Sequence, residues 1–349
     1  MRHHAVSTLF AISGICFTCA GPARAQESDQ RPPKVAPLFE QPGVLTPRDT
    51  YVLEPTVQYA YSSSNRIAFA GYTIIPTVFP GLVDVREVRR NSTTASLTAR
   101  RGITNRFEVE VRVPYVYRSD ALSSRDTLSG SAVDRSFEVS GRKIGDIELA
   151  ARYQFNEGNL TTPYFVGGLR FKSRTGRDPF EVVTDCVTRC AGPGAGGTGL
   201  PLDLPTGSGF YALEPNLAWF MPSGSATFFG TFSYMHNFKR DKVSHTILNG
   251  EREALGDITP PDSFGFNIGM GFALNDLASV SVGYDHISIG RARLNHQTVP
   301  NSLRTQLGTV MAGFSYRLDR QRTLNVSIGA GVTPEAPDVG VMLRVPFAF

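Results

Sequence analysis

The sequence predicts an all-β fold, a transmembrane antiparallel β-barrel of about 12 strands that spans residues 50–349. Three observations predict it. Apolar and polar residues alternate with a period of two from Tyr51 onward. Short polar turns alternate along the chain with long polar loops, and the chain ends on an alternating segment that closes with Phe349. Such alternation gives a strand one apolar and one polar face.

The alternation is clearest in three segments. Residues 107–117 carry mostly Phe, Val and Tyr at odd positions, with Glu108 and Glu110 between them. Residues 147–155 and 264–274 repeat the pattern. Alternation over this length is typical of strands with two different environments on their faces. The expected strands are 50–62, 85–101, 106–118, 146–156, 162–173, 208–221, 226–239, 263–275, 277–290, 303–318, 323–332 and 338–349.

The connections between these strands are of two kinds. Short turns are expected at 102–105, 156–159, 222–225, 275–276 and 319–322. Long polar loops are expected at 119–145, 175–205, 239–262 and 291–302. Short turns on one rim and long loops on the other are typical of outer-membrane barrels. An even number of strands puts both ends of the wall on the periplasmic side.

The last segment alternates Val341, Leu343, Val345, Phe347 and Phe349. An alternating strand with a terminal aromatic residue resembles the C-terminal recognition signal of outer-membrane barrels. We therefore expect Phe347 and Phe349 to form an assembly signal, with the barrel-assembly machinery as a partner.

The chain begins with a predicted secretory signal peptide, residues 1–25. A basic start at Arg2 precedes a mostly apolar stretch, and Ala23-Arg24-Ala25 forms a cleavage site. Neither Cys16 nor Cys19 follows a small residue, so no lipid anchor is expected. Residues 26–49 are rich in proline and have no period, which predicts an irregular periplasmic segment outside the barrel wall.

Composition excludes other classes. No apolar run after the signal approaches the roughly 18 residues of a spanning helix. The net charge of +4 is not accompanied by a helix or aromatic groove that would bind nucleic acid. The glycine-rich stretch 192–199 lacks the Lys-Ser/Thr of a phosphate-binding loop.

Charged residues on the face opposite the apolar one are expected in the lumen, because a charge facing lipid costs about 2–4 kcal/mol at the bilayer midplane. Twelve strands are intermediate in width, so a narrow polar passage and a plug of Arg–carboxylate pairs are both open. The predicted lumen residues are Glu54, Glu108, Glu110, Arg112, Asp146, Glu148, Arg152, Arg170, Glu214, Arg317 and Arg344.

Two cysteines remain after the signal peptide, Cys186 and Cys190, in a long extracellular loop. A secreted protein meets an oxidising compartment, so a disulfide between them is expected. A zinc site would need four ligands, and no histidine or second cysteine pair lies nearby in sequence. No metal and no cofactor are expected.

A second candidate site lies on residues 284–291. His286 and Ser288 share the strand face that points to lipid near the outer rim. The pair resembles the His-x-Ser motif of outer-membrane phospholipases and lipid A deacylases, in which histidine activates serine. Gln306 or Asn301 would have to supply the third polar group.

Basic residues crowd the predicted outer rim, among them Arg142, Lys143, Arg240 and Arg291. Contacts with phosphates of outer-membrane lipid and lipopolysaccharide are one interpretation. A solvated loop surface is the other.

Four segments carry a wider resemblance: 41–47, Leu53-Glu54-Pro55, 102–109 and 145–153. They resemble the outer-membrane transporters grouped with the meta-pathway of phenol degradation, a family distantly similar to pores that export amyloid subunits. The resemblance implies passive transport of a small solute, with aromatic and hydrophobic molecules as candidates. The sequence-based hypotheses are thus a channel without catalysis, a lipid hydrolase using His286 and Ser288, and an export or structural pore.

Overall fold

The computed structural model describes residues 45–64, 84–125, 134–158, 162–184, 201–299 and 303–349. No helix in these ranges is long and apolar enough to cross a membrane. The expected signal peptide, residues 26–44 of the predicted periplasmic segment, Cys186 and Cys190 lie outside them. The strands are β1 (Tyr51–Ser64), β2 (Asp84–Thr104), β3 (Phe107–Arg125), β4 (Asp134–Ile144), β5 (Glu148–Gln154), β6 (Tyr164–Lys172), β7 (Ala212–Ser223), β8 (Ala226–Asn237), β9 (Arg240–Thr246), β10 (Arg252–Thr259), β11 (Ser263–Ala273), β12 (Ala278–Ile289), β13 (Arg293–Leu294), β14 (Gln297–Thr298), β15 (Thr305–Arg317), β16 (Thr323–Gly331), β17 (Val339–Arg344) and β18 (Phe347–Ala348).

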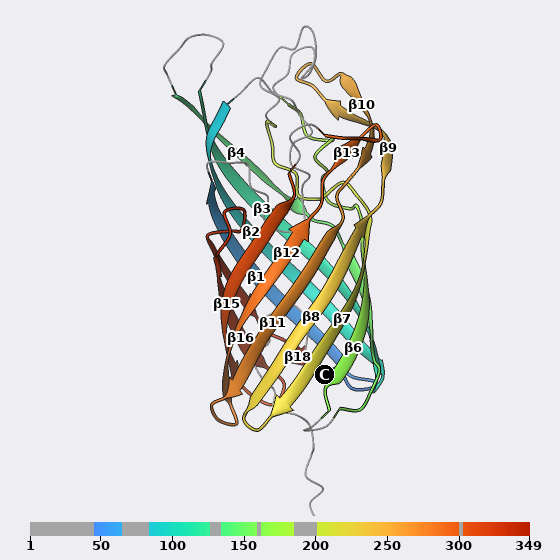
Figure 1. The fold of residues 1–349 in the computed structure, drawn as a ribbon, viewed down its shortest axis with the longest axis vertical. Helices are drawn as coiled ribbons and strands as arrows, with labels where there is room; N and C mark the ends of the chain where they lie inside the picture. Colours follow the sequence, from blue (N-terminus) through green and yellow to red (C-terminus); the bar gives the residue numbers. More distant parts are fainter. Residues whose placement is uncertain (1–44, 65–83, 126–133, 159–161, 185–200, 300–302) are drawn as a thin grey trace, which may run out of the picture. The chain divides into compact units, whose positions relative to one another are not determined.

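The strands close into a barrel (Figure 1). Neighbours follow the order β17-β16-β15-β12-β11-β8-β7-β6-β5-β3-β2-β1, and β1 also pairs with β17, so the wall has no open edge. β4 extends the wall above β5 along β3, and β18 extends it below β17 along β1. This closed barrel of twelve antiparallel strands confirms the predicted fold class.

The two rims of the barrel differ, as Figure 1 shows. Short turns join β2 to β3, β5 to β6, β7 to β8, β11 to β12 and β15 to β16 at one end, which we call the short-turn rim. The C-terminus lies at the same rim, where the N–H of Phe349 donates to the carbonyl of Tyr51 at 2.8 Å. The opposite end, the long-loop rim, carries the long connections.

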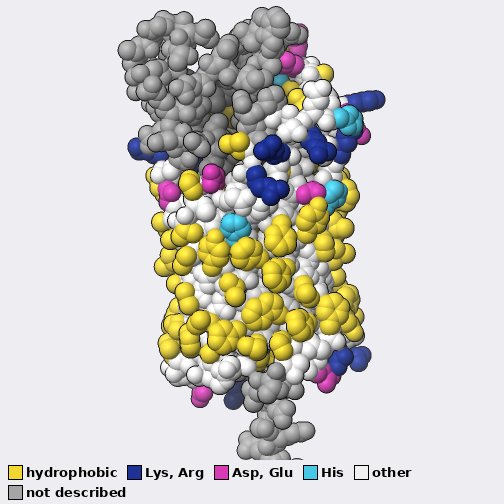
Figure 2. Space-filling model, in the orientation of Figure 1, with side chains coloured by type: hydrophobic (Ala, Val, Ile, Leu, Met, Phe, Trp, Pro, Cys, Tyr) yellow, Lys and Arg dark blue, Asp and Glu magenta, His cyan; other side chains and the backbone are white. Residues whose placement is uncertain are grey.

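Alternation separates an apolar outer face from a polar inner face. On β3, Val109, Val111 and Val113 are exposed, whereas Glu108 is completely buried. Figure 2 shows the exposed apolar side chains as a belt across the face in view, with charged side chains above and below it. Because soluble monomers rarely expose so continuous an apolar surface, the belt is typical of a wall surrounded by lipid.

The long-loop rim is more ordered than the sequence predicts. Residues 119–145 were expected to form a loop, but β3 continues to Arg125 and pairs with β4 over the same stretch. Residues 239–262 and 291–302 were also expected to be loops. Between them they form β9, β10, β13 and β14, a separate four-stranded sheet that we call the cap sheet.

A small apolar core holds the cap sheet to the connection between β6 and β7. Phe180 and Phe210 from that connection pack with Val243 of β9 and Ile258 of β10, and all four are buried. The rings of Phe180 and Phe210 meet edge to face with centroids 5.7 Å apart. The long loops therefore build a folded cap with its own core.

The described end of the N-terminal segment, residues 45–49, contains no strand, but it enters the barrel. Leu45 is buried against Val166 and Ala218, two inward-facing residues of β6 and β7. Arg48 bridges to Gly102 at the end of β2. The sequence predicts this segment outside the barrel wall. Residues 45 and 46 differ from that expectation, because the Leu45 side chain and the backbone N–H of Thr46 both have partners inside the barrel.

Candidate functional site

The charges of the lumen gather on one half of the wall. Most carboxylates and cations project inward from β1, β2, β3, β5, β6, β7 and β17. In contrast, β8, β11, β15 and β16 contribute mainly hydroxyl, amide and glycine positions, and β12 adds the carboxylate of Asp285. The buried polar residues of this second half are Thr227, Thr231, Ser279, Ser281, Ser315, Asn325 and Ser327.

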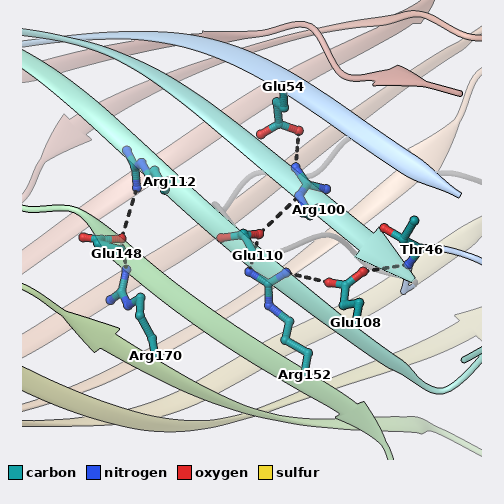
Figure 3. Close-up of polar contacts among 9 residues, drawn as sticks. All are labelled: Thr46, Glu54, Arg100, Glu108, Glu110, Arg112, Glu148, Arg152 and Arg170. Atoms are coloured by element: carbon teal, nitrogen blue, oxygen red, sulfur yellow. Dashed lines mark hydrogen bonds and ion pairs between the residues drawn. The ribbon is translucent and has the colours of Figure 1, made fainter. Parts of the chain in front are cut away.

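One chain of ion pairs crosses β1, β2, β3 and β5 (Figure 3). Arg100 contacts Glu54 at 2.5 Å and Glu110 at 3.2 Å. Arg152 contacts Glu110 at 2.9 Å and Glu108 at 2.6 Å. Arg152 stands directly opposite Glu108 in the strand register, so the pairing follows from the alternation and the register together.

A second chain crosses β3, β5, β6 and β7. Glu148 lies 3.9 Å from Arg112 and 3.4 Å from Arg170. Arg170 also contacts Glu214 at 2.5 Å, its direct neighbour in register. All of these side chains are at most 14% exposed. Each buried charge therefore has an opposite charge beside it, which is the condition for keeping it ionised away from water.

The N-terminal segment completes the first chain at the short-turn end. The backbone N–H of Thr46 donates to Glu108 at 2.7 Å (Figure 3). Glu108 thus accepts hydrogen bonds from Arg152 and from the backbone, and its side chain has no solvent exposure. Together with the burial of Leu45, this contact narrows the lumen near the short-turn rim.

Two cavities lie in the remaining lumen. The first has a volume of about 230 Å³ and is lined by residues of both ion-pair chains together with Asp285, Ile287 and Met342 among others. The second, of about 170 Å³, extends toward the long-loop rim, where Arg118 and Thr206 line it. The cavities share Gln58, Arg112 and Glu148, so they are neighbours along the barrel.

Asp146 anchors the cap above the second cavity. It accepts hydrogen bonds from the N–H of Gly176 at 3.1 Å, and from the N–H and hydroxyl of Ser208 at 2.8 and 2.6 Å. Both residues belong to the connection between β6 and β7. Asp146 therefore fixes that connection over the mouth of the barrel.

The structure brings together most of the predicted lumen residues. Ten of them point inward; Arg344 is buried and lines the first cavity. Arg317 differs: it is exposed at the short-turn end of β15 and lines neither cavity, because alternation no longer fixes the surroundings of the last residue of a strand.

The sequence-based prediction missed Arg100, which links Glu54 to Glu110. The alternation could have found it, because Arg100 lies on the same strand face as the polar residues Ser96 and Thr98, and all three are buried. The neighbouring Arg101, which is exposed, obscured that face.

The residues of the second candidate site form a hydrogen-bonded row on the outer face. Tyr284 Oη lies 2.9 Å from His286 Nδ1, and His286 Nε2 lies 2.9 Å from Gln306 Oε1. Gln306 Nε2 donates to Ser288 Oγ at 2.9 Å. We call these four residues the outer polar row. The amide of Gln306 separates the imidazole from the serine hydroxyl, so His286 is not placed to deprotonate Ser288. Asn301 lies outside the described residues.

Within the described ranges, no group of three or more His, Cys, Asp or Glu side chains is placed to hold a metal ion. The Cys186–Cys190 disulfide remains a prediction.

No protein-family model matches the chain. Among solved structures, the COG4313 outer membrane channel from Pseudomonas putida F1 matches with a TM-score of 0.56 and 14% identity, over 88% of this chain and 98% of that chain. The chain has the fold of that channel. The assignment to transporters of the phenol-degradation type stays a prediction.

Two further matches are weaker. The translocator domain of the autotransporter NalP from Neisseria meningitidis has a TM-score of 0.43 at 10% identity, over 87% of this chain and 89% of that chain. The CymD monoaromatic hydrocarbon channel has a TM-score of 0.38 at 11% identity, over 87% of this chain and 88% of that chain. These matches add no argument about function.

Proposed function

We propose that this protein is an outer-membrane channel for the passive movement of a small solute, without catalysis or cofactor. The observation that carries the proposal is a closed barrel whose polar lumen holds two neighbouring cavities. The apolar belt between charged rims supports placement in a bilayer. A membrane-spanning wall made of β-strands supports location in the bacterial outer membrane.

The cavities favour a small solute. Their volumes of about 230 and 170 Å³ are below the roughly 300–1,000 Å³ of pockets that hold drug-sized ligands. The first cavity is lined by charged and amide groups with the apolar side chains of Ile287, Met311 and Met342 among them. A solute with a polar group and a compact apolar part, such as a single aromatic ring, matches this mixed lining.

Swelling of proteoliposomes tests the channel. Vesicles that contain the refolded protein should swell in glycine much faster than protein-free vesicles, and the rate should fall steeply toward sucrose. Phenylalanine should enter faster than a sugar of similar mass, because Ile287, Met311 and Met342 offer contacts to its ring. Swelling in glycine no faster than in protein-free vesicles would contradict the proposal.

The proposal also includes the features expected from the sequence: a cleaved signal peptide, a disulfide between Cys186 and Cys190, and contacts with outer-membrane lipid. Lipid hydrolysis remains the alternative, although the position of Gln306 between His286 and Ser288 argues against it. Phospholipid or lipid A turnover by purified protein that disappears in Ser288→Ala would favour the hydrolase over the channel.

A further inference from the structure

The outer polar row occupies an unusual place on the barrel. Tyr284, His286 and Ser288 follow the exposed Val282 on the outward side of β12, and Gln306 stands opposite Ser288 on β15. Polar side chains on the outer wall are costly in hydrocarbon but suited to the depth of lipid headgroups. The row therefore marks headgroup depth at the end of the apolar belt.

Two basic side chains lie just beyond the row. Arg304 immediately precedes β15, two residues before Gln306 and nearer the long-loop rim. Arg291 follows the end of β12, whose last residue Ile289 pairs with Thr305. Both arginines are exposed, and across the described ranges neither guanidinium contacts a protein partner. Figure 2 shows Lys and Arg side chains gathered above the belt on this face.

Apolar side chains flank the row and continue beyond its lower end. Phe264 and Ile268 of β11 stand opposite Ser288 and Tyr284, Val310 of β15 stands opposite Tyr284, and Val282 of β12 follows below; all four are exposed. Arginines thus lie beyond one end of the row, and an apolar surface lies beside it and beyond the other end. A ligand that matches the arginines, the row and the apolar surface needs an anionic group, hydroxyl or carbonyl groups and a hydrocarbon chain.

We propose that this face of β11, β12 and β15 binds a phosphorylated lipid of the surrounding leaflet. Arg291 and Arg304 bind the phosphate, because guanidinium groups form strong, directional hydrogen bonds with phosphate oxygens. The outer polar row hydrogen-bonds the headgroup, and the acyl chains lie along Ile268, Val282 and Val310. A free phosphate would use only the arginines, whereas the apolar wall below them requires a chain. The inference rests on the proposed outer-membrane placement.

Native mass spectrometry of the detergent-purified barrel with bisphosphorylated lipid A tests the site. The double variant Arg291→Gln/Arg304→Gln should retain lipid A at least about fivefold less than the wild type, and dephosphorylated lipid A should bind the wild type equally weakly. Gln306→Leu should weaken retention while leaving the arginines in place. The matched control is Arg317→Gln/Arg320→Gln, which removes two exposed arginines at the short-turn rim and should leave retention unchanged.

Equal retention by the wild type and Arg291→Gln/Arg304→Gln would overturn the inference, as would equal loss in the control. Complete displacement by millimolar inorganic phosphate would also overturn it, because the site would then be an anion site without a lipid. Conductance in bilayers of pure phosphatidylcholine should be the same for all variants. Loss of the lipid proposal therefore leaves the channel proposal intact. Conversely, a protein that retains lipid A but shows no conductance would contradict the channel proposal and leave the lipid site standing.

Discussion

At the scale of single residues, Arg152 and Arg112 perform different tasks in the lumen. Arg152 is the direct partner of two buried carboxylates, Glu108 and Glu110. Arg112 lines both cavities and approaches Glu148, which Arg170 also contacts. Removal of Arg152 therefore leaves the buried carboxylate of Glu108 without its arginine partner. Removal of Arg112 leaves Glu148 still in contact with Arg170.

Arg152→Ala should lower the free energy of unfolding by about 3–5 kcal/mol, the cost of an uncompensated buried charge. Arg112→Ala should cost about 1 kcal/mol or less and should change the ion selectivity of the channel, because it alters the cavity lining. Urea unfolding in a detergent or lipid environment measures the first effect, and reversal potentials measure the second. Equal stability losses in the two variants would contradict this division of roles.

At the scale of elements, the cap sheet depends on its own small core. Ile258 is completely buried with Phe180, Phe210 and Val243, whereas Leu248 in the turn between β9 and β10 is 52% exposed. Ile258→Ala should therefore destabilise the cap locally by about 2–5 kcal/mol. Limited proteolysis should cut the variant within residues 239–262, while the barrel keeps its heat-modifiable gel mobility.

Leu248→Ala is the matched control and should resist proteolysis like the wild type, because an exposed side chain contributes little. Loss of the folded barrel in Ile258→Ala would show that the cap and the barrel are a single cooperative unit, contrary to this account.

The N-terminal segment is the second element with a distinct role. A Cβ added at Gly102 would overlap the carbonyl oxygens of Thr46 and Pro47, whereas a Cβ at Gly340 of β17 would meet only the carbonyl oxygen of Tyr59 at 3.9 Å. Gly102→Ala should therefore displace residues 45–49 from the wall, and Gly340→Ala should not. Increased protease access to residues 45–49 in Gly102→Ala alone is the expected result; equal access in both variants would contradict it.

The twelve barrel strands could be predicted because two different environments act on every residue of the wall. Lipid outside and a polar lumen inside impose the alternation, so each expected segment overlaps a barrel strand. The cap sheet could not be predicted in this way, since β9 and β10 face water on one side and a core of a few residues on the other. The position of Leu45 depends on contacts with Val166 and Ala218, more than one hundred residues away, which no local pattern shows.

At the scale of the whole molecule, closure and assembly depend on the last strand. β17 pairs with β1 from Val339 to Arg344, and Phe349 forms backbone hydrogen bonds with Tyr51 in both directions. Phe349 is 69% exposed, so its side chain is accessible for recognition. Deletion of Phe349 should leave the protein in the periplasm rather than in the outer membrane, as fractionation would detect. Normal insertion of the deletion variant would contradict the predicted assembly signal.

The central claim is that the charged lumen is a passage, narrowed near the short-turn rim by Leu45 and Thr46. Single-channel recording of the refolded protein in planar phosphatidylcholine bilayers tests it most directly. The wild type should show a small, steady conductance. Gly102→Ala, which displaces residues 45–49, should show a larger one, and Gly340→Ala should show the wild-type value. No conductance in any of the three correctly folded proteins would contradict the claim and identify a sealed barrel.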